Sequence, residues 1–177
     1  MRNLGTLILL VLASAGAAAG QKSHSVYTPL DEKHCRQTDM STLETGDYEA
    51  RCRGVAGYTL IVAEGDLRQN ITVVTPGGAE HSLQLYELIS SGFSTVGPKA
   101  EWRMTLKGKK FVPVALIVRF NASDDPNNPD KHTSYLAVSK IAADEICVTD
   151  KILPGPKANE EARRAADVAV SKPCLKR

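Results

Sequence analysis

Residues 111–120 form a nearly continuous apolar run, which predicts a strand with apolar side chains on both faces. In an extended segment, alternate side chains point to opposite sides. One side would carry Val112, Val114, Leu116, Val118 and Phe120. The other side would carry Phe111, Pro113, Ala115 and Ile117, followed by Arg119. A strand that is apolar on both faces must be covered on both faces, so the chain has to build a layer on each side of this segment.

Pro113 limits how this strand can pair. Proline has no N–H to donate to a ladder, so it is found at strand starts, at bulges and on exposed edges. The sequence therefore predicts one of these three features at Pro113.

The C-terminal part of the chain changes to a helical period after the turn residues 154–156. Small apolar residues recur at helical spacing, namely Ala158, Ala162, Ala165, Ala166, Ala169 and Val170. This pattern predicts a helix over residues 158–170, with Asn159 as its N-cap. Because the apolar stripe is mostly alanine, the helix can approach a neighbour closely. It is the expected cover for the second face of the 111–120 strand.

Other β-branched or alternating segments predict strands at residues 58–63, 71–75, 101–106, 135–139 and 145–149. Residues 82–88 alternate in part and predict another strand, with a helix as the alternative. Residues 21–56 are polar and predict a loop-rich segment ahead of a β core over residues 57–149. The predicted fold class is α+β, mainly β: an antiparallel sheet or flattened barrel with one C-terminal helix packed on it, in a single domain over residues 21–177.

Residues 1–20 have the pattern of a signal peptide. Arg2 gives a positive start, residues 7–13 are apolar, and small residues at 17–19 suit cleavage after Ala19 or Gly20. The apolar run ends short of the roughly 20 residues that span a bilayer, which disfavours a membrane anchor. Cleavage leaves about 157 residues with a net charge near +1, which suits one domain and argues against nucleic acid. We expect a periplasmic or secreted protein, most simply a monomer.

The chain has four cysteines, Cys35, Cys52, Cys147 and Cys174. An even number in a secreted chain indicates two disulfides, for which three pairings are possible. The pairs Cys35–Cys52 and Cys147–Cys174 are favoured because the members of each pair are close in the sequence. Neither CxxC nor a Cys/His pair at zinc spacing occurs, so no metal site is predicted.

Charged residues on the predicted strands are the strongest candidates for a functional site, namely Asp66, Arg68, Glu101, Arg103 and Arg119. Asp66 and Arg68 are two residues apart, hence on one face of an extended segment, and Glu101 and Arg103 flank Trp102 in the same way. One interpretation is a structural network of arginine–carboxylate pairs that holds strands in register. The alternative is a pocket for an anion, floored by Trp102, the only tryptophan of the chain.

The sequence predicts no catalytic residue and no cofactor. Ser94 lies between Gly92 and Gly97, but a nucleophile elbow needs its second glycine two places after the serine. Residues 124–130 are rich in aspartate and asparagine, yet they lack the glycine and the final glutamate of an EF-hand loop.

Four segments occur in an order that resembles a known group: residues 52–58, 63–68, 93–103 and 158–163. Together they are similar to an uncharacterised family of small secreted proteins of alphaproteobacteria, over roughly residues 27–167. The resemblance implies a bacterial, periplasmic setting. It supplies no activity, ligand or catalytic residue, and Cys174 lies beyond the similar stretch.

These observations favour an exported, non-enzymatic binding module of unknown ligand. One concrete form is an inhibitor or protector that acts on another protein through a protruding loop, at residues 93–99 or 121–131. It would resemble bacterial lysozyme inhibitors in size, export, β content and disulfides, an analogy of class only. The first alternative is a periplasmic binder of a small anion or a lipid that uses Trp102, Arg68 and Arg103. The second alternative is a secreted hydrolase.

Overall fold

The computed structural model describes residues 23–38 and 47–177. The predicted signal peptide and residues 39–46 of the predicted loop-rich segment lie outside them. The elements are β1 (His24–Pro29), β2 (Cys35–Gln37), β3 (Tyr48–Arg53), β4 (Thr59–Gly65), β5 (Arg68–Val74), β6 (Glu80–Ser82), α1 (Leu85–Leu88), β7 (Ser94–Lys107), β8 (Lys110–Ser123), β9 (His132–Ile141), β10 (Ile146–Ile152), α2 (Ala158–Asp167) and the 3-10 turn η2 (Ala169–Ser171).

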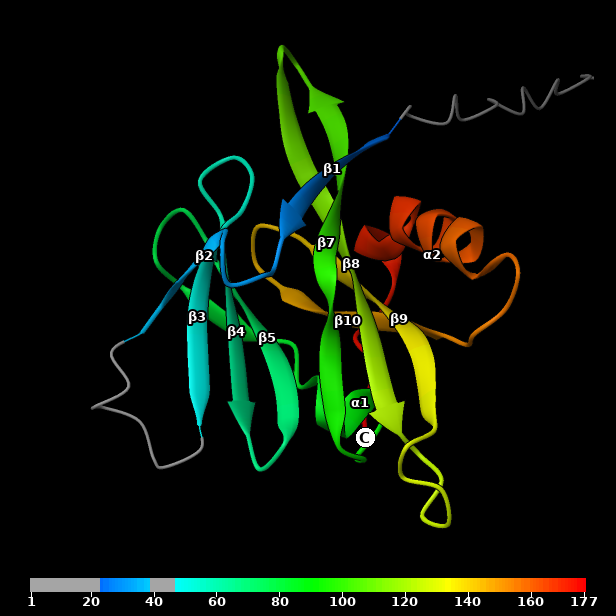
Figure 1. Ribbon diagram of the computed structural model, residues 1–177. Coiled ribbons are helices and arrows are strands. Elements are labelled where there is room, and N and C mark those ends of the chain that lie inside the picture. Colours follow the sequence, from blue (N-terminus) through cyan, green and yellow to red (C-terminus); the bar gives the residue numbers. More distant parts are fainter. Residues whose placement is uncertain (1–22, 39–46) are drawn as a thin grey trace, which may run out of the picture.

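The ten strands form one open, mixed sheet (Figure 1). Its order is β10-β9-β8-β7-β5-β4-β3-β2, while β1 pairs with β7 and β6 pairs with β5. The pairs are antiparallel except for a single parallel bridge between Arg68 of β5 and Ser94 of β7. A mainly β fold with a C-terminal helix is confirmed. Of the two predicted forms, the sheet is the one found, and it does not close into a barrel.

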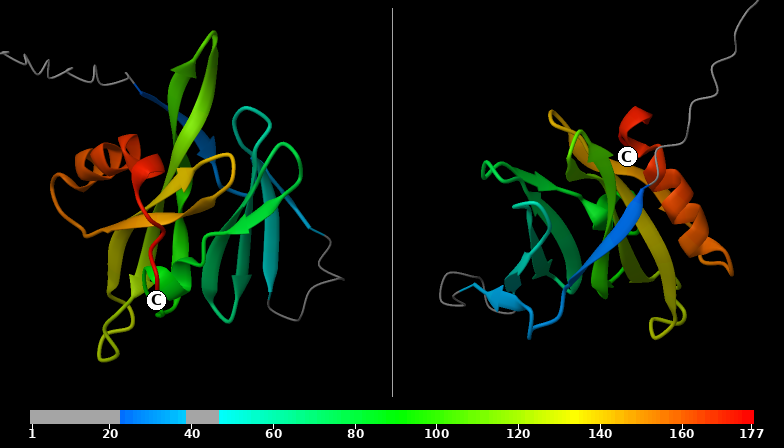
Figure 2. Two further views of the ribbon diagram at one scale, coloured as in Figure 1. Left: turned by 180° about the vertical axis from the view of Figure 1, so that it is seen from behind. Right: turned by 90° about the horizontal axis from the view of Figure 1, so that it is seen from above.

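The two faces of β8 are covered by different layers, as its sequence predicts. Leu116, Val118 and Phe120 lie in the main core together with Trp102, all fully buried. Ala115 and Ile117 form the floor of a second cluster on the other face. The alanines of α2 pack on this second cluster, and Figure 2 shows the helix lying along that side of the sheet.

Pro113 marks a bulge and an edge, so the prediction for this residue is confirmed. The β7–β8 register shifts between the pairs Arg103–Ala115 and Met104–Pro113. β9 pairs with β8 only from Ala115 onward, so Pro113 lies outside that ladder. β1 likewise pairs with β7 only up to Met104. Residues 105–112 therefore pair only with each other and form a projecting hairpin (Figure 1).

The prediction of a loop-rich segment over residues 21–56 is wrong for β1, β2 and β3, which all lie within it. Thr28 is the one buried residue of β1, and the partner strand β7 lies about 75 residues further along the chain. Most side chains of these three strands are exposed or half-buried, which accounts for the polar sequence. β1 pairs with a strand that is distant in the sequence, and the local sequence does not indicate such a partner.

The expected strand at residues 82–88 is also largely wrong. β6 ends at Ser82, and the short helix α1 begins at Leu85. Gln84, between them, has a left-handed backbone with φ of 50°, which breaks the extended conformation. Asn70 then accepts a hydrogen bond from the Leu85 N–H, at 2.9 Å.

Both disulfides have the expected pairing. Cys35–Cys52 joins residues that are direct partners in the β2–β3 ladder. Cys147–Cys174 joins β10 to the segment after η2. There the Leu175 N–H donates to the Val148 carbonyl at 2.8 Å, and Leu175 packs against the main core. Because Ala169 belongs to the cluster on the other face, the C-terminal segment passes around the edge of the sheet at β10.

Candidate functional site

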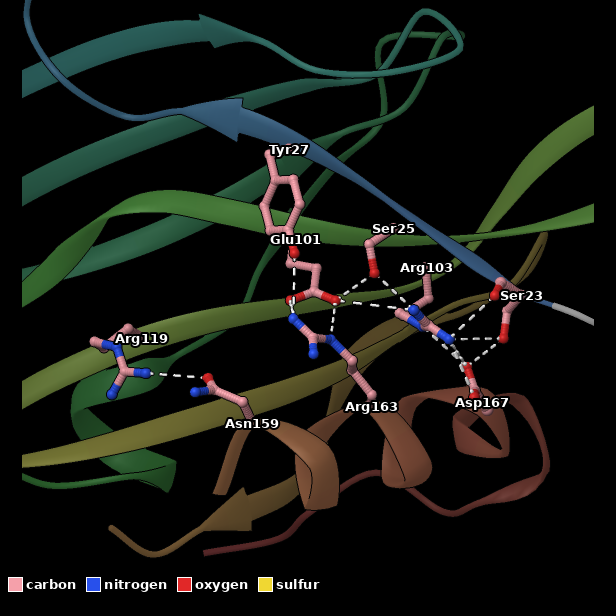
Figure 3. A network of polar contacts seen from close by, with 9 residues as sticks. All are labelled: Ser23, Ser25, Tyr27, Glu101, Arg103, Arg119, Asn159, Arg163 and Asp167. Atoms are coloured by element: carbon pink, nitrogen blue, oxygen red, sulfur yellow. Dashed lines mark hydrogen bonds and ion pairs between the residues drawn. The ribbon is translucent and has the colours of Figure 1, made fainter. Parts of the chain in front are cut away.

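Glu101 and Arg103 of β7 form a network that joins three distant parts of the chain (Figure 3). Glu101 and Arg103 are two residues apart in β7, so both point toward α2, where they meet Arg163 and Asp167. The side chains of Ser23 and Ser25, at the start of the described chain, complete the network. It therefore ties β1 and α2 to the middle of the sheet.

The geometry of this network is that of two bidentate arginine–carboxylate pairs. Arg163 donates to Glu101 from Nε at 2.7 Å and from Nη2 at 3.1 Å. Arg103 donates to Asp167 from Nε at 2.9 Å and from Nη2 at 3.2 Å. The Arg103 side chain is only 9% exposed, so its charge needs these partners. The structural interpretation of Glu101 and Arg103 fits this arrangement.

Glu101 gives the network a dependence on pH. Burial by itself raises the pKa of Glu101, but hydrogen bonds from Arg163 and Ser25, with the charges of Arg163 and Arg103, lower that pKa below its usual value. A lowered pKa in the folded state means that Glu101 contributes stability above its unfolded pKa, about 4.3. This contribution is lost as the pH falls through the lower, folded pKa.

We expect Glu101→Gln to lower the free energy of unfolding by about 1–2 kcal/mol at neutral pH, because it removes charge-assisted hydrogen bonds to a partly exposed arginine. Urea denaturation from pH 3 to pH 7 measures this. The difference between wild type and variant should shrink below about pH 4. Glu160→Gln is the matched control: Glu160 lies on α2, is 65% exposed and is 3.7 Å from Arg164. An equal loss in both variants would contradict a special role for Glu101.

Trp102 does not floor a pocket with these charges, so the predicted grouping is wrong. Alternation along β7 places Trp102 on the opposite face from Glu101 and Arg103, where it is fully buried in the main core. Its Nε1 donates to Thr28 Oγ1 at 2.9 Å, and its ring lies 5.7 Å from that of Tyr58. Trp102 is a core residue.

Asp66 and Arg68 form a separate cluster, which also corrects the expectation of one network. Asp66 lies in the β4–β5 turn, Arg68 begins β5, and the two side chains pair with each other. Arg68 Nε donates to the Ser91 carbonyl at 2.9 Å, and the guanidinium lies 5.1 Å from the centre of the Phe93 ring. A hollow of about 620 Å³ adjoins this pair, but Asp47, Glu64 and Asp66 make its lining acidic. It is therefore a poorer site for an anion than its one arginine suggests.

Arg119 lies at a smaller pocket, here called the β8–α2 pocket, where β7, β8 and β9 meet the start of α2. This pocket has a volume of about 140 Å³ and is lined by Tyr27, Pro98, Lys99, Glu101, Ile117, Arg119, Leu136, Asn159 and Ala162. Ile117, Leu136 and Ala162 are buried and form an apolar floor. The polar groups stand at the rim, so the pocket combines apolar and cationic surfaces.

A bulge in β7 builds this pocket. Gly97, Pro98 and Lys99 lie between the pairs Val96–Phe120 and Ala100–Val118, so three residues face the single residue Arg119. A Cβ on Gly97 would lie 2.8 Å from the Arg119 Cβ, so glycine permits this close approach. The bulge also brings the Lys99 ammonium to 4.8 Å from the centre of the Tyr27 ring.

Asn159 contacts Arg119 rather than capping the helix. α2 follows Lys157 as its N-cap residue, with no side-chain cap hydrogen bond, and ends at Asp167, before the 3-10 turn η2. Arg119 donates from Nη2 to Asn159 Oδ1 at 3.2 Å and from Nη1 to Ser134 Oγ at 2.8 Å. Of the five N–H donors of a guanidinium, these two bonds leave three for a ligand.

Of the two predicted inhibitory loops, residues 93–99 are mostly strand, whereas most of residues 121–131 are a loop as predicted. Ser94 to Lys99 belong to β7, and Asn121 to Ser123 belong to β8, so only residues 124–131 connect β8 to β9. Ser94 itself is 3% exposed and lies opposite Ala122. Both the β8–β9 loop and the projecting hairpin extend beyond the sheet, at opposite ends of β8 (Figure 1).

Sequence reasoning placed Arg119 among the candidates but missed Lys99, Tyr27 and Asn159. Lys99 follows Gly97 and Pro98, a turn signal next to a predicted strand, and this was the one available sign of a bulge. Tyr27 lies on β1, which is distant from Arg119 in the sequence. Asn159 lies on α2, and the register of this helix against the sheet must be known before Asn159 can be placed at the pocket.

Comparisons with protein-family models, with curated proteins and with solved structures found no match for this chain. Within residues 23–38 and 47–177, no helix is long and apolar enough to cross a membrane.

Proposed function

We propose that this protein is an exported binding module that takes a small organic carboxylate in the β8–α2 pocket. Export is supported by the leader pattern at residues 1–20 and by the two disulfides. The observation that carries the ligand proposal is the presence of two cations, Lys99 and Arg119, which form no ion pair among the described residues.

The charges around the pocket leave an excess of positive charge. Glu101 lines the pocket, but Arg163 and Arg103 neutralise it, and Asp167 completes that set with two negative and two positive groups. Lys99 and Arg119 stand outside this balance. Arg119 is half-buried, whereas Lys99 is exposed. The half-buried charge of Arg119 favours a bound counter-ion, because the surrounding protein screens it less than water does.

The lining favours a carboxylate with a short apolar part. A guanidinium presents its donors in a fork that matches a carboxylate, and Arg119 keeps donors for this purpose. The apolar floor of Ile117, Leu136 and Ala162 suits a few methylene groups. At roughly 30 Å³ for each water, the volume of 140 Å³ corresponds to about five waters, so the ligand has only a few heavy atoms.

We expect saturable binding of acetate and butyrate, with butyrate tighter because its alkyl chain covers the apolar floor. Arg119→Gln should weaken binding about 10- to 100-fold, the effect of losing a hydrogen bond to a charged group. Two-dimensional NMR titration measures both affinities and shows whether shifts centre on Ile117 and Ala162. Inorganic phosphate, which has no apolar part, should bind more weakly than butyrate.

The matched control is Arg164→Gln. Arg164 is on α2 but is 65% exposed and pairs with Glu160 rather than lining the pocket. Its replacement should leave the affinity for butyrate within about twofold, since screened surface charges have small effects. The absence of saturable binding by any short carboxylate, or equal weakening by both variants, would contradict the proposed function.

A further inference from the structure

The projecting hairpin carries two exposed apolar side chains that the β8–α2 pocket does not use. Leu106 and Phe111 are direct cross-strand partners and are 45% and 54% exposed. The His24 ring contacts the Phe111 ring edge-on, with 4.4 Å between the ring centres. Neighbouring apolar side chains at the extremity of a fold form a contact surface, unlike the scattered single ones found on any protein.

The rest of the hairpin end is basic. Lys107 and Lys110 are also direct cross-strand partners, and Lys109 lies in the turn between them after Gly108, whose φ is +62°. Residues 104–113 contain no acidic residue. Within the part of the chain that the structure describes, none of the three lysines forms an ion pair.

The pairing of Lys107 with Lys110 is unfavourable for the hairpin itself. Like charges directly opposite each other destabilise an antiparallel pair, whereas opposite charges stabilise it. A glutamate at either position would therefore suit the isolated fold better. The two lysines gain a favourable interaction only when an anionic surface outside the fold contacts them.

We propose that the projecting hairpin docks on an anionic lipid surface. Leu106 and Phe111 enter the headgroup region, while Lys107, Lys109 and Lys110 contact lipid phosphates. This combination of apolar and basic side chains is the one by which peripheral segments bind membrane interfaces. Because successive pairs alternate, Leu106 and Phe111 lie on the opposite face of the hairpin from Lys107 and Lys110. An acidic protein patch would contact only one of these faces, whereas lipid headgroups can surround both. The projecting hairpin can also insert among lipid headgroups, which rearrange around it, without a complementary pocket in a partner.

The proposed docking leaves the β8–α2 pocket accessible. In the β1–β7 ladder, His24 pairs with Met104 beside the hairpin, whereas Pro29 pairs with Lys99 at the pocket, so the two sites lie at opposite ends of β1. The two proposals therefore rest on different residues and are tested separately.

Co-sedimentation with lipid vesicles tests the docking. We expect the protein to sediment with phosphatidylcholine vesicles that contain a quarter of phosphatidylglycerol, and to remain in solution with phosphatidylcholine alone. Binding should fall as salt is raised, because the Debye length shortens. The triple variant K107Q/K109Q/K110Q should bind about 100-fold more weakly, since each lysine near an anionic surface contributes roughly fivefold. The double variant L106S/F111S should bind at least about tenfold more weakly.

Two controls separate docking by the hairpin from general electrostatic attraction. K131Q/K157Q/K176Q removes the same charge from exposed lysines elsewhere and should keep the affinity within about twofold. Soluble polyaspartate should bind wild type and L106S/F111S equally, because it offers no apolar phase. All substituted residues are exposed, so circular dichroism should show unchanged folding.

Three results would overturn the proposal. The first is no sedimentation with anionic vesicles; if polyaspartate still binds in that case, the partner is an acidic macromolecule. The second is an equal loss of vesicle binding in the two triple variants. The third is undiminished vesicle binding by L106S/F111S.

Discussion

A Trp102→Ala variant should lose about 3–5 kcal/mol of unfolding free energy, the usual cost of truncating a large buried side chain. Trp102 is fully buried between β1 and β8, where its neighbours in the two ladders are Val26 and Leu116. A Cβ on Gly54 would lie 3.0 Å from the Trp102 ring, which shows how closely the backbone packs on it. Since small domains have a total stability of about 5–15 kcal/mol, this loss is a large fraction of the whole.

Denaturation followed by circular dichroism measures this loss, because the variant has no tryptophan to report by fluorescence. Trp102→Phe is the companion variant: it keeps an aromatic ring in the core and loses the hydrogen bond to Thr28. We expect it to lose less stability than Trp102→Ala. A loss below about 1 kcal/mol for Trp102→Ala would contradict the burial of this side chain.

Removing the Cys147–Cys174 disulfide by double replacement with alanine should cost about 3.5 kcal/mol. The two residues are 27 apart, and the chain-entropy model gives this value for a loop of that length. Native-state hydrogen exchange would locate the effect. The Leu175 amide, which donates to the Val148 carbonyl, should lose protection together with the C-terminal segment.

The corresponding replacement of Cys35 and Cys52 is the comparison. Its loop spans 17 residues, so the same model gives a loss of about 3 kcal/mol. Protection of the Leu175 amide should survive in this second variant, because the segment that holds Leu175 is tied to β10 and not to β2. Equal deprotection of Leu175 in both variants would show that the C-terminal segment is not held locally by its own disulfide.

The central strand, the helix and the disulfides could be predicted because each depends on residues close in the sequence. The two apolar faces of residues 111–120 required two covering layers, and the alanine stripe of α2 supplied one of them. β1 could not be predicted in this way, since its six residues gain their stability from pairing with β7. Nothing within such a short polar segment indicates a partner so far away.

The candidate site was predicted in part. The period of two in β7 correctly put Glu101 and Arg103 together, and the same period places Trp102 on the opposite face, where no shared pocket is possible. The β8–α2 pocket depends on the bulge at Gly97, Pro98 and Lys99. A bulge shifts the register of every following residue, so it has to be seen in three dimensions before the pocket can be assembled.

The early place of β1 in the chain has a consequence for how the protein folds. Its ladder partners lie at residues 99–104, and Arg163, further still along the chain, donates to the hydroxyl of Tyr27 in β1. Contacts between segments so far apart form slowly, because a long loop must close first. In an exported chain that crosses the membrane amino end first, β1 emerges long before either partner. If the chain is exported as proposed, β1 stays without its ladder partners until β7 has followed it across the membrane.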